Sequence, residues 1–395
     1  MPNIQLINKV KYNPIIYYLY YKVGSFCLHF IRLFIKANSK LIVFVSFGGR
    51  KFDDSPKSIY YQILGDSRFV DYRLVWAFIN PDTFSIPRGE KVQIDTPKYF
   101  FLLLKARCWI TNSSVERGLS ISGKNTFYLN TWHGTAMKKM GEDIASSTTS
   151  FKAKSNSSNI DLMLAQGQYD VDLFSRVFGI PISNFMITGL PRNDELISNN
   201  TPMIRDDIKR RLGISNGKKV ILYAPTFREY TKDPGNNVIQ SIPLSFDRLK
   251  QELSDDFVIL LRAHYEVLKV LGIQEDSFLH NVSTYPCLND LMLVSDMLVS
   301  DYSSIFFDYS ILEKPMLCYA YDYQEYQEKR GLYFDVRVSL DSFISNEDEL
   351  INEVKRASLE PEEYVKRTVT FRTKYVTEYG DASRKCADII YKAIQ

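Results

Sequence analysis

The sequence predicts an α/β protein with two mainly parallel sheets, each covered by helices on both faces. Short apolar runs alternate with helical or loop stretches, and this alternation occurs twice along the chain. The length agrees, because 395 residues with 45% hydrophobic and 24% charged side chains suffice for about two domains. We therefore expect two Rossmann-like lobes with a cleft between them.

The first series of strand and helix signals covers residues 39–195. Its clearest strand is Leu41 to Ser46, a continuous apolar run of the kind buried on both faces, and it ends in the flexible turn Phe47 to Gly49. A helix from Lys57 to Leu64 follows the cap and first-turn residues Asp54 to Pro56. The other predicted strands are Tyr72 to Ile79, Lys91 to Ile94, Cys108 to Thr111, Thr126 to Thr131 and Leu162 to Ala165.

The second series covers residues 196–360 and begins with a polar helix around Arg205 to Leu212. Residues 361–395 are charged and helical in pattern, so we expect a C-terminal helix that could cross back to the first lobe. The predicted strands of the second series are Val220 to Ala224, Phe257 to Leu261, Val282 to Tyr285, Met297 to Ser300 and Pro315 to Tyr319.

The N-terminal segment, residues 1–38, is dense in Tyr and Phe. Lys22 and Arg32 interrupt its apolar residues, so no run of about 18 apolar residues is present for a membrane-spanning helix, and no cleavage site of a signal peptide follows. We expect amphipathic helices in the membrane interface, with Tyr and Phe inward and Lys and Arg toward anionic headgroups. The alternative is packing on the protein's own surface or on another subunit, which is compatible with a homo-oligomer.

Charge, cysteines and motifs exclude several classes of site. A net charge of +3 is too small to indicate nucleic-acid binding. The five cysteines lack the spacing of a metal site and fit a reducing compartment. Asp170-Val171-Asp172 has the spacing of a carboxylate metal motif, but it lies in a predicted helix, where the two carboxylates would not converge on one ion. We predict no metal site and no cofactor.

Two of the chain's four histidines directly follow predicted strands, in different lobes. They lie in Trp132-His133-Gly134 and in Arg262-Ala263-His264. Ligands of open α/β sheets bind beyond the carboxyl ends of the strands, and a neutral imidazole there can accept a proton near neutral pH. A single histidine is more often structural, but two such histidines with a neighbouring arginine indicate a reactive site.

The stretch Met297 to Phe307 is predicted to be a buried strand that runs into a Ser-capped helix. A helix start directs unpaired N–H groups and the positive dipole end at one spot, so it can hold a phosphate, and Ser303 and Ser304 add hydroxyl donors. An ordinary N-cap is the simpler interpretation of this stretch alone. A further strand-end loop, Tyr223 to Arg228, offers Pro225, Thr226 and Arg228. Together these loops indicate phosphate chemistry.

Six motifs resemble those of the CDP-glycerol glycerophosphotransferase family, whose members build the poly(glycerol phosphate) or poly(ribitol phosphate) of wall teichoic acids and related capsules. The similarity extends from about Ser46 to about Asp335, with the motifs in the family's order and spacing. Ala136 departs from the family's pattern, which commonly has Pro there. The motifs are WHGT (Trp132 to Thr135), GLPRND (Gly189 to Asp194), LYAPTFR (Leu222 to Arg228), RAHY (Arg262 to Tyr265), SDYSS (Ser300 to Ser304) and RGLYFD (Arg330 to Asp335).

The resemblance implies a GT-B-type fold in which the first lobe, residues 39–195, is the acceptor lobe and the second lobe, residues 196–360, holds most of the nucleotide. It also implies a role for each matching residue. These are His133 and His264 in catalysis; Arg262, Ser303 and Ser304 at the donor phosphates; Pro225, Thr226 and Arg228 at the nucleotide; and Gly134 and Asp301 as supporting residues.

The implied reaction is transfer of glycerol phosphate from CDP-glycerol to a hydroxyl of a lipid-linked teichoic-acid or capsule-type acceptor, with release of CMP. The protein would act peripherally, at the cytoplasmic face of the cell membrane. His133 would deprotonate or orient the acceptor hydroxyl, and His264 and Arg262 would stabilise charge on the phosphoryl oxygens. The alternatives are a CDP-ribitol transferase, a GT-B sugar transferase that uses a nucleotide sugar, and a non-catalytic membrane scaffold.

Overall fold

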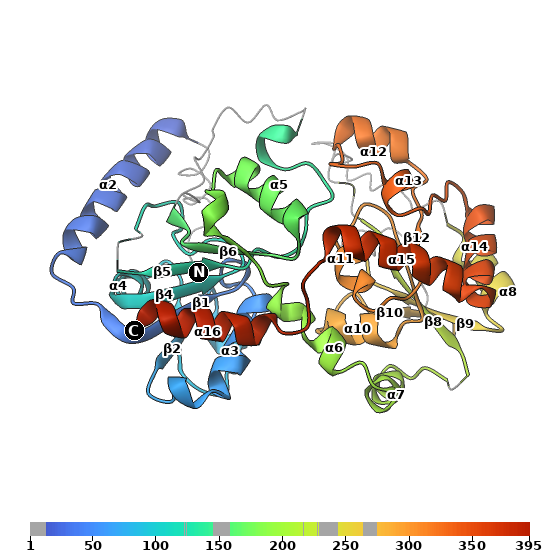
Figure 1. Cartoon of the computed structure of the whole chain (residues 1–395), viewed down its shortest axis with the longest axis horizontal. Coiled ribbons are helices and arrows are strands. Elements are labelled where there is room, and N and C mark those ends of the chain that lie inside the picture. Colours follow the sequence, from blue (N-terminus) through green and yellow to red (C-terminus); the bar gives the residue numbers. More distant parts are fainter. Residues whose placement is uncertain are drawn as a thin grey trace. The chain divides into compact units, whose positions relative to one another are not determined.

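The structure, a computed structural model, describes residues 13–121, 123, 125–144, 159–215, 217–226, 228, 244–263 and 275–395. It divides into two compact units, which are described separately. Unit 1 comprises Met1–His133, Thr148–Asp194 and Asp381–Gln395, and unit 2 comprises Gly134–Ser147 and Glu195–Gly380. The predicted α/β class with parallel sheets is confirmed in both (Figure 1).

Unit 1 holds a parallel sheet of seven strands in the order β3-β2-β1-β4-β5-β6-β7. The order reverses between β1 and β4, and this topological switch point is where open α/β sheets bind ligands. The strands are β1 (Asn38–Val45), β2 (Arg73–Phe78), β3 (Glu90–Gln93), β4 (Ala106–Thr111), β5 (Phe127–Asn130), β6 (Leu162–Ala165) and β7 (Phe185–Ile187).

The helices of unit 1 come from both ends of the chain. A buried apolar cluster joins the sheet to α3 and to the C-terminal α16, which contributes Cys386, Ile390 and Ile394. The helices are α2 (Pro14–Arg32), α3 (Asp54–Leu64), α4 (Pro97–Lys105), α5 (Gln168–Phe178) and α16 (Ala382–Ile394), with short 3-10 turns at Phe47–Gly49, Ser67–Phe69, Pro81–Thr83, Ile182–Asn184 and Pro191–Asn193.

Unit 2 holds a parallel sheet of five strands in the order β10-β9-β8-β11-β12, which reverses between β8 and β11. Its strands are β8 (Lys219–Ala224), β9 (Phe257–Leu261), β10 (Leu279–Asn281), β11 (Met297–Ser300) and β12 (Met316–Cys318). Its helices are α6 (Glu195–Ser198), α7 (Pro202–Arg211), α8 (Phe246–Leu253), α10 (Leu288–Val294), α11 (Ile305–Ser310), α12 (Tyr323–Lys329), α13 (Val336–Ser339), α14 (Glu347–Leu359) and α15 (Pro361–Tyr375), with a 3-10 turn at Gly141–Asp143.

Three elements differ from the sequence prediction. The strand expected at Val282 to Tyr285 is β10, three residues earlier, because Leu279–Asn281 pair with β9 and Tyr285 N–H closes a turn onto the Val282 carbonyl. Strand β7 was not predicted, since three edge residues give no apolar run. The tail is two helices rather than one: α15 ends before Gly380, whose φ of 87° cannot continue a helix, and α16 belongs to unit 1.

Helix α2 is one helix, and one of its faces packs on unit 1. The Tyr20 hydroxyl donates to the Arg117 carbonyl (3.1 Å), and Ser25 Oγ accepts from Ser120 N–H (2.9 Å). Arg32 was expected to point toward headgroups. It is instead turned onto the protein, where its terminal guanidinium nitrogens are buried and a Cβ at Gly123 would meet them. No helix among the described residues is long and apolar enough to cross a bilayer.

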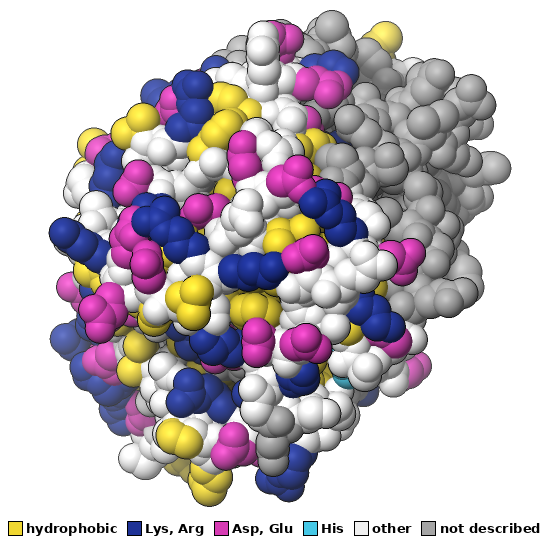
Figure 2. All heavy atoms as spheres, turned by 90° about the vertical axis from the view of Figure 1, so that its right-hand side faces the viewer, with side chains coloured by type: hydrophobic (Ala, Val, Ile, Leu, Met, Phe, Trp, Pro, Cys, Tyr) yellow, Lys and Arg dark blue, Asp and Glu magenta, His cyan; other side chains and the backbone are white. Residues whose placement is uncertain are grey.

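The face of the molecule drawn in Figure 2 carries intermixed charges. Lys and Arg side chains alternate there with Asp and Glu, and they do not gather into a patch of one sign. This pattern agrees with the small net charge of +3.

Candidate functional site

His133 lies in the loop that follows β5, with its ring orientation fixed by a backbone group. Its Nδ1 lies 2.8 Å from the carbonyl oxygen of Asn112, the first residue after β4. A carbonyl can only accept a hydrogen bond, so Nδ1 carries the hydrogen and Nε2 keeps the lone pair. Nε2 is therefore the nitrogen of this imidazole that can take a proton.

Aromatic side chains enclose the His133 ring. Trp132 stacks on it with centroids 4.1 Å apart, and Phe47 lies 5.8 Å away. Burial lowers the pKa of His133 below its ordinary value, and this effect outweighs the opposing effect of the hydrogen bond that Nδ1–H donates to the Asn112 carbonyl. The imidazole is consequently held in its neutral form at neutral pH, as a general base requires.

An ion pair supports the backbone of His133. Arg192 Nη1 donates to Asp54 Oδ2 (2.9 Å) and to the carbonyl oxygen of His133 (2.8 Å). Both side chains are largely buried. The charge of Asp54 raises the pKa of His133, while Arg192 and Arg50 lower it. One pair of opposite charges thus supports the backbone of His133 and also contributes, less than burial, to its pKa.

Backbone conformations around His133 are strained. Phe47, Asp54 and Trp132 have φ values of 48°, 65° and 50°, in the left-handed region that most side chains avoid. Gly49 (φ 83°) has no room for a side chain, because a Cβ would lie 2.2 Å from Ile94 Cδ1. Such conformations persist only where the surroundings impose them, and they gather at functional sites.

In unit 2, the loops after β8 and β11 are joined through Asp301. This buried carboxylate accepts from the backbone N–H of Thr226 (2.9 Å) and of Tyr302 (2.6 Å), and from Arg228 Nη1 (2.9 Å). Pro225 and Thr226 are half-buried beside it. Asp301 therefore holds the two loops of the switch point together.

Arg228 is a buried arginine with two carboxylate partners. It contacts Asp301, and its Nε and Nη2 donate to Asp322 (2.6 and 2.9 Å). Its guanidinium also lies 5.1 Å from the ring centroid of Tyr302 and 5.2 Å from that of Tyr321. Arg228 was predicted to bind nucleotide, and this stays a prediction; within the protein its guanidinium pairs with Asp301 and Asp322.

The other predicted donor-binding residues follow β9 and β11, which lie on either side of β8 in the sheet of unit 2. Arg262 follows β9 and donates through Nη1 to the carbonyl of Tyr285 (2.8 Å). Ser303 Oγ accepts from Ile305 N–H (3.3 Å), whereas Ser304 occupies the cap position of α11 without a side-chain cap bond. The predicted Ser-capped helix is therefore only the six residues of α11, and its hydroxyl contact comes from Ser303. His264 lies outside the described residues.

The predicted helix around Asp170 and Asp172 is confirmed as α5. Asp170 is buried and accepts from Gln166 N–H, whereas Asp172 accepts from the Gln168 amide. Among the residues that the structure describes, no group of three or more His, Cys, Asp or Glu side chains could hold a metal ion. Gly134, predicted as a supporting residue, is buried and has a φ of 131°.

Sequence reasoning missed the partners of His133 and Arg228. Asn112 contributes a backbone carbonyl, which leaves no signal in a sequence. Asp54 was taken for a helix-capping residue, and Arg192 stood in a motif without a role. Asp322 could have been noticed as an acidic residue shortly after a strand. Each is brought to its partner by the order of the strands in the sheets.

Two α/β units with parallel sheets, each with polar loops at its switch point, are the arrangement of a GT-B-like fold. The chain belongs to the CDP-glycerol:poly(glycerophosphate) glycerophosphotransferase family, whose profile matches residues 27–392. The family predicted from the six motifs, and the GT-B-like fold that it implied, are thereby confirmed.

Individual relatives agree with this assignment. A teichoic acid glycerol-phosphate transferase of Staphylococcus aureus is 34% identical over 90% of this chain and 94% of its own length. A teichoic acid poly(glycerol phosphate) polymerase of Staphylococcus epidermidis is 33% identical over 90% of this chain, which spans only 51% of that longer protein. The solved structure of the wall teichoic acid polymerase TagF matches with a TM-score of 0.82 at 31% identity, over 91% of this chain and 90% of that one.

Proposed function

We propose that this chain transfers glycerol phosphate from CDP-glycerol to a hydroxyl of a lipid-linked acceptor of the teichoic-acid or capsule type, and releases CMP. The observation that carries the proposal is the fixed tautomer of His133. Its protonated Nδ1 faces the Asn112 carbonyl, so Nε2 is left as a base in an aromatic, partly dry setting. Membership of the family indicates CDP-glycerol as the donor, and the imidazole of His133 provides a general base.

In the proposed reaction, His133 Nε2 takes the proton of the acceptor hydroxyl as its oxygen attacks the β-phosphorus of CDP-glycerol. The bond from that phosphorus to the bridging oxygen breaks, and CMP leaves with the electron pair. Arg262, Ser303 and Ser304 hold the diphosphate, and His264 with Arg262 balances the charge that develops on the phosphoryl oxygens. Asp301, Arg228 and Thr226 keep these loops in place.

Replacement of His133 tests this proposal. His133→Ala should reduce the rate of CMP release about 10²–10⁴-fold, the usual contribution of a general base. Binding of CDP-glycerol, measured by calorimetry, should change little, because the imidazole acts on the acceptor. His29→Ala is the matched control, since His29 is exposed on α2. Turnover that survives in His133→Ala would refute the assigned base.

The donor and the metal requirement are tested in the same assay. We expect CMP release from CDP-glycerol and not from CDP-ribitol, and we expect equal rates with and without EDTA, because Arg262 and the loop hydroxyls take the place of a cation. Faster release from CDP-ribitol would assign the alternative donor. A rate abolished by EDTA and restored by Mg²⁺ would contradict the predicted independence of metal.

We further propose that α2 holds the protein at the membrane surface, where a lipid-linked acceptor is met. Its outward side chains are apolar: Ile15, Phe26 and Phe30 are 72%, 71% and 54% exposed. Lys22 lies among them, at a position suited to anionic headgroups. Burial of such side chains in the interface is favourable, so an exposed apolar helix face fits a peripheral protein.

Sedimentation with anionic phosphatidylglycerol vesicles tests this membrane role. Leu19→Ser combined with Phe26→Ser should weaken vesicle binding about tenfold or more, because both apolar side chains are lost from the outward face. Leu359→Ser, at an 82% exposed position at the end of α14, is the control and should leave binding unchanged. Equal binding of all three proteins would refute the role of α2, and a dimer disrupted by the double variant would favour a subunit contact.

A further inference from the structure

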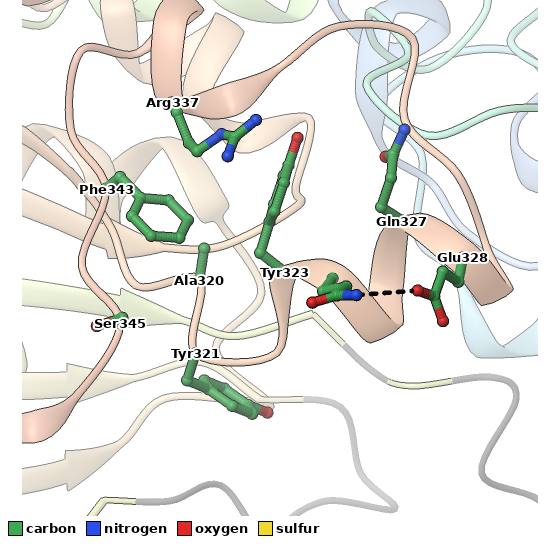
Figure 3. A pocket seen from close by; sticks show the side chains of 9 residues that line it. Ala320, Tyr321, Tyr323, Gln327, Glu328, Arg337, Phe343 and Ser345 are labelled. Carbon is green, nitrogen blue, oxygen red and sulfur yellow. Dashed lines mark hydrogen bonds between the residues drawn. The ribbon is translucent and has the colours of Figure 1, made fainter.

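Unit 2 contains an open depression of about 480 Å³ that none of the roles above uses. It lies beyond the carboxyl end of β12, between the loop after that strand, helix α12 and the stretch from α13 to α14 (Figure 3). Its volume is within the range of about 300–1,000 Å³ that is usual for small-molecule sites. It is lined by Ala320, Tyr321, Tyr323, Gln324, Gln327, Glu328, Arg337, Phe343 and Ser345.

Aromatic rings form a corner in this depression. The rings of Tyr323 and Phe343 lie 5.7 Å apart at an interplanar angle of 87°. A flat base stacks between parallel rings, whereas a corner of perpendicular rings suits the C–H groups of a non-planar aliphatic ligand. Phe343 is 41% exposed, although a large aromatic side chain gains free energy from burial. The ring is thus available to a ligand.

The polar side chains of the depression are mixed in charge. Arg337 lies over the Tyr323 ring at 4.9 Å and donates through Nε and Nη2 to Asp335 (2.9 and 2.6 Å), so its charge is already balanced. Gln324 Nε2 donates to Glu328 Oε1 (3.3 Å), and Figure 3 shows Gln327 on the far side of Tyr323 from Phe343. Amides, a carboxylate and an arginine offer both donors and acceptors, which is what hydroxyl groups need.

Side-chain contacts link the wall of the depression to the candidate donor loops. Tyr321, on its wall, lies against the Arg228 guanidinium, and Asp322 accepts from Arg228 and from the Tyr302 hydroxyl (3.0 Å). Arg228 in turn bonds to Asp301, in the loop that carries Ser303 and Ser304. The wall of the depression is therefore connected, within the same unit, to the loops that we assign to the donor phosphates.

We infer that this depression binds the glycerol units of the acceptor chain, away from the hydroxyl that reacts. The inference rests on the proposed function for the identity of the acceptor. The C–H groups of a glycerol unit pack in the corner of Tyr323 and Phe343, and its oxygens bond to Gln324, Gln327 and Ser345. The phosphates of the chain remain outside, because the site has one arginine and that arginine is paired with Asp335.

Binding of a synthetic oligo(glycerol phosphate) tests the inference without any turnover. The full chain, Phe343→Ala, Gln324→Ala and Val338→Ala are titrated with the hexamer in a calorimeter. Phe343→Ala should weaken binding about tenfold and Gln324→Ala several-fold, and Val338→Ala should not differ, because Val338 is exposed on α13 but does not line the depression. Failure of the wild type to bind, or equal affinity of all four proteins, would overturn the inference.

Transfer kinetics provide the second arm. In Phe343→Ala, the KM for a lipid-linked acceptor should rise about tenfold while kcat and the KM for CDP-glycerol stay the same, as expected when only acceptor binding is weakened. A rise in the KM for CDP-glycerol instead would assign the depression to the donor and overturn the inference. If the wild type releases no CMP, the proposed function fails, and the calorimetric arm still decides whether the depression binds glycerol phosphate chains.

Discussion

His133 is fixed at two points, through its ring and through its backbone. The ring bonds to the Asn112 carbonyl, and the carbonyl of His133 itself accepts from Arg192. The first contact sets the tautomer, and the second fixes the backbone from which the ring extends. Since Arg192 is paired with Asp54, the negative charge nearest to the imidazole also belongs to this support. The contacts that position His133 therefore also influence the pKa of its imidazole.

The variant Asp54→Asn tests the charge of Asp54 separately from its hydrogen bond to Arg192. Asn keeps an oxygen that can accept from Arg192, and it tolerates the positive φ of residue 54 better than most residues. The charge of Asp54 raises the pKa of His133, so its removal should lower that pKa further. In the proposed reaction, activity requires neutral His133 and therefore rises as pH passes the pKa of this imidazole. The acidic limb of the pH–rate profile should therefore move to lower pH.

The profile of kcat/KM against pH measures this shift. Arg192 and Arg50 are the other charges that act on His133, and both are kept in this variant. Asp53→Asn, one residue away, is the control and should leave the limb in place. A limb that moves to higher pH, or does not move in Asp54→Asn, would show that this carboxylate does not act on the catalytic imidazole.

The position of His133 could be predicted from the sequence, but its partners could not. A histidine after an apolar run must lie at the carboxyl edge of a parallel sheet, because that is where such strands end. Asn112 is 21 residues away and follows a different strand, and only the pairing of β4 with β5 brings the two together. Likewise the sequence did not indicate that Arg228 pairs with Asp322, because Asp322 lies 94 residues further along the chain.

At the scale of elements, long apolar strands were predicted to within a few residues, whereas short or polar ones were not. β1 and β8 are continuous apolar runs buried on both faces, so their identity follows from composition alone. β10 carries His280 and Asn281, and its place depends on pairing with β9. The sequence pattern predicted a helix at α16. That this helix belongs to unit 1 follows from its buried contacts, which cannot be read from the pattern.

The start of α16 is held by a carboxylate from a distant part of unit 1. Asp194 accepts from the N–H groups of Ala382 (2.9 Å) and Ser383 (2.7 Å), which have no partners within the helix. Asp194→Ala should therefore lower the free energy of unfolding by about 0.5–2 kcal/mol, the usual cost of a lost cap. Urea unfolding followed by circular dichroism measures the change.

Asp381→Ala provides the control for this cap. Asp381 occupies the residue before α16, but its side chain makes no cap bond and pairs with the exposed Arg384. Its removal should cost less than about 0.5 kcal/mol, as is usual for an exposed ion pair. Equal stability of the two variants would mean that Asp194 does not anchor the helix.

At the scale of the whole molecule, the chain passes from unit 1 to unit 2 directly after His133, the candidate general base. His133 is the last residue of that segment of unit 1, and Gly134 is the first of the next segment, which belongs to unit 2. Within unit 2, that segment is bound to the RGLYFD motif. Lys138 pairs antiparallel with Leu332, and Tyr333 N–H donates to the Met137 carbonyl (2.9 Å). This motif, which the sequence left without a role, thus fixes the chain just after His133.

The Tyr333 hydroxyl makes this attachment testable. It accepts from Met140 N–H (2.9 Å) and donates to Asp143 (2.8 Å), so Tyr333→Phe removes two of the bonds that hold the segment after His133 and keeps the ring. We expect kcat to fall about tenfold through misplacement of the imidazole, with the KM for CDP-glycerol unchanged. Tyr364→Phe is the matched control: it also removes a hydroxyl bond to a carboxylate in unit 2, to Glu353 (2.6 Å), but far from this segment. Thermal unfolding should shift similarly in both variants, so a loss of kcat in both, or in neither, would contradict the attachment.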